Sequence, residues 1–247
     1  MIALGLDTST PAVSVALAEV TADRVDVLAA GVVVDARRHG ELLAGEIASA
    51  LASAGVPAAA VGAVVVGLGP GPYTGLRVGV ATAAAFADAL GVAVYGVCSL
   101  DALAHEARLV QAPDAGPHTA IAVAVDARRK ELYWARYDAA GTRVVGPAVS
   151  RSAELVAHLG PDDLLAGEGF ALYPDAVSGH RLLAHPRHPG AGALLALAAA
   201  RIRASAPADA LAPLYLRRPD AVPPAAVTGA CREGASRPTA AGEGGRR

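Results

Sequence analysis

One strand–turn–strand pattern occurs twice in this sequence, and the repeat limits the folds open to the chain. The segment IALGLDTSTPAVSVAL, which starts at Ile2, aligns without gaps on IAVAVDARRKELYWAR, which starts at Ile121. The alignment places Asp7 over Asp126, each at the end of an apolar run of strand type. A repeat of this order indicates two similar α/β halves that arose by duplication.

The first half has the pattern of a sheet covered by helices. The run 63–68 is continuously apolar, which is typical of a strand with both faces covered. Gly55 and Pro57 mark the end of a helix whose apolar residues recur every three to four positions. We predict strands at 2–7, 12–18, 25–34, 63–68 and 92–97, and helices at 41–54, 76–90 and 100–110.

The second half is expected to repeat this arrangement less regularly. We predict a third strand at 143–149, a helix at 152–159, a strand at 163–168 and an Ala/Leu-rich helix at 191–204. After Arg218 the sequence is dense in Pro, Gly and Ala and lacks aromatic residues, which predicts a flexible tail. We therefore expect three parts: an N-terminal lobe at 1–112, a C-terminal lobe at 113–217 and a tail at 218–247.

Charge and cysteine usage narrow the class of protein. The formal net charge is −2, which gives no overall field that would attract nucleic acid. Cys98 lies in an apolar run and Cys231 in a polar one, and two cysteines are too few for a disulfide framework or a zinc site. We expect both to be reduced thiols of a cytoplasmic protein.

The sequence does not favour export or a membrane anchor. The apolar N-terminus lacks a positively charged start and is interrupted by Asp7. The segment 78–100 approaches membrane-spanning length, but Asp88 and Gly91 interrupt it, so a buried helix followed by a strand is expected. We therefore expect a soluble protein.

The block GPGPYTGLRVG at 69–79 opens a predicted helix but does not match the phosphate-binding motifs. Leu76 stands where a Walker A loop needs lysine, and no third glycine follows at Rossmann spacing. Pro70 and Pro72 each remove a backbone N–H donor, although Thr74 could serve as the N-cap. We expect any anion to be secondary, and the glycines to let a neighbouring backbone approach closely.

The helices at 41–54 and 76–90 carry more apolar surface than a sheet alone can cover. The second is apolar on both sides, and the first is rich in alanine. Two such helices side by side leave an exposed apolar patch, which usually marks a protein interface. Several of the candidate interface residues must nevertheless face the sheet, and the sequence does not sort them: Leu43, Ile47, Leu51, Leu76, Val80, Ala83 and Ala87.

At these motifs the chain resembles the bacterial TsaB family, also called YeaZ. The resemblance rests on LDTSTPAVSVAL, GLGPGPYTGLRVGVATAAAFA, VDARRKELYWARY and PLYLRR, and extends in order to about Arg218. One departure is Pro72 with Tyr73, where the family more often has Ser-Phe. The resemblance implies a duplicated actin-like, sugar-kinase-like α/β fold, with two lobes that each hold a mixed sheet flanked by helices.

The same resemblance implies partners and a function. TsaB proteins act with the catalytic subunit TsaD and the ATPase TsaE, which place a threonylcarbamoyl group on the adenosine beside the anticodon of tRNAs. TsaB forms heterodimers with TsaD, or homodimers when alone, through N-terminal helices that correspond here to 41–54 and 76–90. The chain is therefore expected to be a non-catalytic subunit that requires no cofactor of its own.

Particular positions support a non-catalytic role within the resemblance. TsaD holds its metal with two histidines spaced H-x-x-x-H, and those positions fall on Ser99 and Leu103, so the metal is expected on TsaD and not here. The turns DTST and DARR lack the glycine that actin-like ATPases use near phosphate. Asp7, Thr8 and Asp126 mark a residual nucleotide cleft in which ATP or ADP binding stays open, although turn capping by the two aspartates is favoured.

Other functions remain alternatives at this point. An ATP-dependent small-molecule kinase would need glycine-bearing phosphate turns and a general base. A peptidase is suggested by HEARL at 105–109, but Leu109 stands where a second zinc-binding histidine belongs, and no G-x-S-x-G motif occurs. His39 could act as a base by position, but such a histidine more often caps a helix. A structural dimer unrelated to tRNA is also consistent with the sequence.

Overall fold

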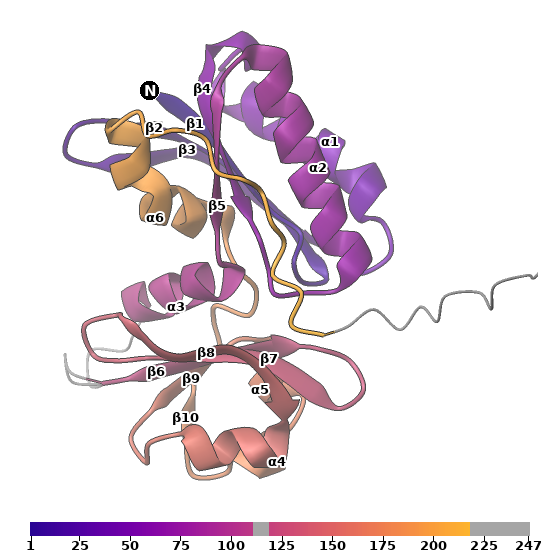
Figure 1. The fold of residues 1–247 in the computed structure, drawn as a ribbon, viewed down its shortest axis with the longest axis vertical. Helices are drawn as coiled ribbons and strands as arrows, with labels where there is room; N and C mark the ends of the chain where they lie inside the picture. Colours follow the sequence, from indigo (N-terminus) through magenta and orange to yellow (C-terminus); the bar gives the residue numbers. More distant parts are fainter. Residues whose placement is uncertain (111–118, 218–247) are drawn as a thin grey trace, which may run out of the picture.

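A computed structural model describes residues 1–110 and 119–217, which form two lobes, each built on a five-stranded sheet (Figure 1). The first sheet contains β1 (Ile2–Asp7), β2 (Ala12–Val20), β3 (Val25–Val34), β4 (Val61–Gly67) and β5 (Ala93–Val97). The second sheet contains β6 (Ile121–Asp126), β7 (Glu131–Tyr137), β8 (Arg143–Arg151), β9 (Leu164–Ala166) and β10 (Arg181–Leu182).

The sequence repeat is a repeat of topology. The strand orders are β3-β2-β1-β4-β5 and, read in the same sense, β8-β7-β6-β9-β10. In both sheets the first three strands pair antiparallel, and the last two lie parallel to the first. The predicted duplicated actin-like α/β fold is therefore confirmed.

Helices cover both faces of the first sheet. On the outer face, α1 (His39–Ala54) and α2 (Tyr73–Leu90) bury Leu and Ile side chains against the valines of β2 and β4. On the inner face, α6 (Ala191–Arg203) packs small and branched side chains against β1 and β2. The short elements are α4 (Ser152–Leu155), α5 (Glu168–Ala171), η1 (Ala58–Ala60), η2 (Val156–His158) and η3 (Pro174–Val177).

Two helices each pack on the sheet of the other lobe, so the lobes are not formed by two separate halves of the sequence. The helix α3 (Ser99–Leu109) lies within 1–112 but packs on β6 of the second sheet, and α6 lies within 113–217 but packs on the first sheet. The two helices contact each other and form the layer between the sheets (Figure 1). The expected boundary at 112/113 and the tail at 218–247 fall outside the described residues, as does Cys231.

Most predicted elements are present, with different ends. The helix α2 begins at Tyr73, because the Leu76 N–H donates to the Pro72 carbonyl at 3.1 Å and closes a turn there. Pro72 is therefore the N-cap residue, and the prediction of Thr74 as N-cap is wrong. The helix predicted at 152–159 is split into α4 and η2, and the strand predicted at 163–168 is shortened to β9.

The segment after α6 joins the two lobes. The Leu214 N–H donates to the Leu68 carbonyl at 2.8 Å, and Asp209 accepts from the Gly96 N–H and from Arg201. Further along, Arg217 donates to the Ala127 carbonyl at 3.0 Å. Figure 1 shows this segment running past β5 and α2 to the second lobe. No helix among the described residues is long and apolar enough to cross a bilayer.

Candidate functional site

The glycine block packs directly on the turn that follows β1. A Cβ atom on Gly71 would overlap the Ser9 carbonyl, and one on Gly75 would lie 2.8 Å from the Thr8 carbonyl oxygen. The Thr8 hydroxyl donates to the Gly75 carbonyl at 2.7 Å and accepts from the Gly79 N–H at 3.1 Å. The expected close approach of a second backbone is thus confirmed, and that backbone is the Thr8–Ser9 turn of the same chain.

Asp7 is held inside the first lobe. Its Oδ1 accepts from the Ser9 N–H at 2.8 Å and from the Ser9 hydroxyl at 2.7 Å, and its Oδ2 accepts from the Ser99 hydroxyl at 2.6 Å. Burial raises the pKa of Asp7, whereas these hydrogen bonds oppose the rise. The favoured interpretation of Asp7 as a turn-capping residue is confirmed, and the residue is only 1% exposed.

The corresponding turn of the second lobe is basic. Asp126 Oδ1 accepts from the Arg128 N–H at 2.7 Å, so this aspartate also caps its turn. Arg128, Arg129 and Lys130 have φ values of 62°, 55° and 62°. Left-handed backbone costs about 1–2 kcal/mol at a non-glycine residue. The neighbouring β6–β7 pairing holds three exposed cationic residues in this conformation.

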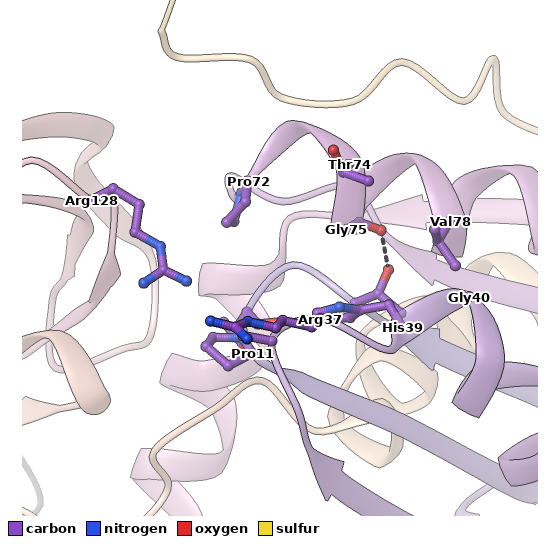
Figure 2. A pocket seen from close by; sticks show the side chains of 12 residues that line it. Pro11, Arg37, His39, Gly40, Pro72, Thr74, Gly75, Val78 and Arg128 are labelled. Atoms are coloured by element: carbon purple, nitrogen blue, oxygen red, sulfur yellow. Dashed lines mark hydrogen bonds between the residues drawn. The ribbon is translucent and has the colours of Figure 1, made fainter.

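A cavity of 290 Å³ lies between these turns and the first turns of α1 and α2. Figure 2 shows the guanidinium groups of Arg37 and Arg128 directed toward this space from different lobes. The uncapped start of α2 contributes Pro72, Thr74 and Gly75 to the wall. We call this space the basic cavity. It is lined by Thr8, Thr10, Pro11, Ala36, Arg37, His39, Gly40, Pro72, Thr74, Gly75, Val78 and Arg128.

A second cavity, of 820 Å³, lies between the lobes. Its walls include Val32 and Val34 of β3, Glu106 of α3, and the stretch from His185 to His188. Burial raises the pKa of Glu106 to about 7, and the charge of Asp7 adds to this rise. We call this space the interlobe cavity.

Two other titratable groups of the interlobe cavity, Glu168 and His188, are also shifted toward their neutral forms. Burial raises the pKa of Glu168 and lowers the pKa of His188, whose Nδ1 lies 3.7 Å from Glu168 Oε2. A neutral carboxyl and a neutral imidazole can exchange protons with a ligand. The walls around them are largely apolar.

The positions that correspond to the histidines of TsaD have structural roles in this fold. The Ser99 hydroxyl donates to Asp7 and accepts from the Gly69 N–H at 3.1 Å, while Leu103 is fully buried against the second sheet. Among the described residues, no three histidine, cysteine or carboxylate side chains are grouped so that they could hold a metal ion.

The candidate interface residues separate into two groups. Leu43, Ile47, Leu76, Ala83 and Ala87 are buried in the core, so they cannot contact a partner directly, whereas Leu51 and Val80 are half-buried. The outward surface instead consists of small residues, with four charged residues in the two helices: Glu41, Glu46, Arg77 and Asp88. We call this exposed surface the α1–α2 face, formed by Ala44, Gly45, Ala48, Ala52, Ala81, Ala84 and Ala85.

The histidines considered from sequence have local contacts. His39 opens α1, and its Nε2 lies 2.8 Å from the Thr10 carbonyl oxygen, which supports a structural role at the helix start. His105 is half-buried, and burial lowers its pKa. Glu106 and Glu168 were not among the site residues predicted from sequence, although Glu106 is the second residue of the HEARL motif. Arg37 was also missed, because an exposed arginine next to Arg38 gives no signal that separates it from an ordinary solvated residue.

One family model, several curated relatives and two solved structures match most of this chain. The family described as TsaD, tRNA N6-adenosine threonylcarbamoyltransferase, matches residues 17–180. Uncharacterized proteins of Mycobacterium bovis and Mycobacterium tuberculosis are 45% identical over 229 residues, 91% of this chain and 96% of theirs. The solved structure of YeaZ from Pseudomonas aeruginosa is 30% identical, with a TM-score of 0.71, and the match covers 87% of this chain and 99% of that one.

A second solved structure gives a similar result. It is an uncharacterized protein from Pseudomonas aeruginosa, described as similar to the peptidase YeaZ. It is 29% identical, with a TM-score of 0.70, and the match covers 87% of this chain and 99% of that one.

Gly79→Ala should lower the free energy of unfolding by about 1–3 kcal/mol. The new methyl group would overlap the Thr8 hydroxyl, which must then leave both of its hydrogen bonds to α2. Gly45→Ala is the matched control, because a Cβ there meets no atom within 4 Å, and the change should stabilise α1 by about 0.5–1 kcal/mol. Urea denaturation measures both; equal stability of the two variants would contradict the packing argument.

The wild-type protein should lose stability between about pH 4.5 and pH 7 because Glu106 is buried, and the Glu106→Gln variant should not show this loss. In this window the unfolded chain has released the Glu106 proton while the folded chain keeps it, so the wild-type free energy of unfolding falls as pH rises. After discounting for solvent screening, the variant should gain about 1 kcal/mol over the wild type above this window. Denaturation curves at several pH values, with the exposed Glu19→Gln as control, measure the effect. Parallel wild-type and Glu106→Gln profiles would refute it.

Proposed function

The chain belongs to the TsaB (YeaZ) family, and on this premise we propose that it is a non-catalytic partner subunit of a bacterial tRNA-modifying complex. It binds and supports the catalytic TsaD subunit and acts with the ATPase TsaE. The complex makes N6-threonylcarbamoyladenosine next to the anticodon. The complex acts in the cytoplasm, where tRNA is modified. This chain requires no cofactor of its own.

The observation that carries the proposal is the surface of α1 and α2. The buried large side chains of both helices pack on the sheet, and most exposed residues on the outward side are alanine, glycine or serine. Such a surface is poorly solvated and lets a partner helix approach closely. A face of this kind suits docking by TsaD, or by a second copy of the chain when TsaD is absent.

The positions around Asp7 support a non-catalytic role. A catalytic relative would place a metal-binding histidine where Ser99 donates to the buried Asp7. Ser99 gives the buried carboxylate a hydroxyl donor but offers no imidazole nitrogen to a metal. The second position, Leu103, belongs to the core under α3. The chemistry is therefore assigned to TsaD.

Reconstitution tests the function directly. The chain is mixed with TsaD, TsaE, tRNA, ATP and threonylcarbamoyl-adenylate, and each component is omitted in turn while the modified adenosine is quantified. A partner subunit yields product only when TsaD is present, and omission of this chain should lower the yield at least about tenfold. ATP turnover with a small substrate alone would instead indicate a kinase, and cleavage of protein without tRNA would indicate a peptidase.

Ala48→Arg and Ala85→Arg, each on the α1–α2 face, should weaken association with TsaD by about tenfold or more. Both side chains point to solvent, so the folded chain tolerates arginine, whereas a close helix–helix contact does not. Ala200→Arg, at an exposed alanine of α6, is the matched control and should bind TsaD normally. Calorimetric titration measures the affinity. If the two face variants bind as tightly as the control, TsaD docks elsewhere.

A further inference from the structure

The basic cavity combines cationic groups from both lobes. The lining of the cavity contains Arg37 and Arg128 but no carboxylate. Among residues 1–110 and 119–217, no carboxylate forms an ion pair with the Arg37 guanidinium. Arg128 lies 3.4 Å from Asp126, but its side chain is 59% exposed and can reach a ligand. Two guanidinium groups that face one space from different lobes favour an oxyanion between them.

The neutral groups of the cavity suit the same ligand. The helix α2 has no side-chain cap, and the N–H groups of a first helical turn have no partner within the helix. Thr74 adds an exposed hydroxyl at this point of the wall. Since Thr8 and His39 already bond to backbone carbonyls, the donors available to a ligand include the guanidinium groups, the Thr74 hydroxyl and the helix start.

An exposed aromatic cluster adjoins the cavity across the first turn of α2. The rings of Tyr73 and Tyr215 lie 5.1 Å apart, and the Arg77 guanidinium lies 4.1 Å from the centre of the Tyr73 ring. Tyr73 and Tyr215 are 45% and 41% exposed. Exposed aromatic rings with arginine, next to a place for phosphate, are the elements that bind single-stranded nucleic acid. A free phosphate ion has no base that could stack on these rings.

We propose that the basic cavity binds a phosphate group of an RNA backbone, and that the Tyr73–Arg77–Tyr215 cluster stacks on an adjacent base. The inference rests on the proposed function, because tRNA is the substrate of the complex. Arg129 and Lys130 extend the positive surface along the same turn as Arg128. The chain thus has a local RNA contact although its formal net charge is −2.

The test compares a double variant with a matched double control. Arg37→Ala with Arg128→Ala removes both guanidinium groups of the cavity. Arg24→Ala with Arg203→Ala removes the same charge at the opposite end of the β2–β3 hairpin, where Arg203 donates to the Thr21 carbonyl. Affinity for a tRNA transcript is measured by fluorescence anisotropy at several salt concentrations, with the full chain alone and with TsaD. Inorganic phosphate and ATP are titrated in parallel, and thermal melting confirms folding.

The proposal expects the cavity variant to bind tRNA about tenfold more weakly at low salt, with a slope of log affinity against log salt that is shallower by about 1–2. The control variant should match the wild type, and both variants should still associate with TsaD. If the wild-type chain does not associate with TsaD, the proposed function is refuted. The tRNA titration of the chain alone still tests the basic cavity in that case.

Three results would overturn the proposal. One is equal tRNA affinity of wild type, cavity variant and control. Another is a loss of phosphate or ATP binding in the cavity variant while tRNA affinity is unchanged, which would make the cavity a site for small anions. The third is an absence of tRNA binding by the wild type both alone and with TsaD.

Discussion

The arrangement of the first lobe depends on the hydrogen bonds that the buried carboxylate of Asp7 accepts. An aspartate removed from water needs several donors, and here it receives them from Ser9 and Ser99. These contacts fix the end of β1 to the start of α3, and Gly67 leaves out the side chain that would occupy the same space. Since α3 then packs on the second sheet, one buried acid ties the turn of the first lobe to the core of the second.

The two sides of α2 follow from this packing. On the inner side, glycines let the helix lie directly on the turn at Thr8, and the same turn leaves no room for larger residues. On the outer side, alanine replaces the polar residues that a solvent-facing helix usually carries. The first two turns of α2 thus lie close to their own lobe, while the small outward residues leave room for a partner to approach the same helix. The glycines at the start of α2 therefore serve the packing of the fold first, and the proposed anion site at the helix start follows from the same geometry.

The sequence predicted the duplicated sheet well but the packing of its helices poorly. The repeat from Ile2 and Ile121 depends on local strand pattern and turn chemistry, which sequence records directly. The apolar residues of α3 and α6 show that both helices are buried, but an apolar stripe does not specify which sheet covers it, so the crossover was not predicted. For the same reason Leu43 and Ala83 were grouped with surface residues, although the sheet covers both.

The basic cavity could not be found from sequence for a different reason. Arg37 and Arg128 are far apart in the chain, and they face one space only because the duplicated turns meet between the lobes. The turn that carries Arg128 also uses a left-handed backbone that arginine and lysine disfavour, so local propensity argues against it. The cavity lies where α1 and α2 begin, and the α1–α2 face runs along the same two helices. If TsaD docks on that face, its own surface borders the cavity, and an RNA held there by phosphate would be shared by both subunits.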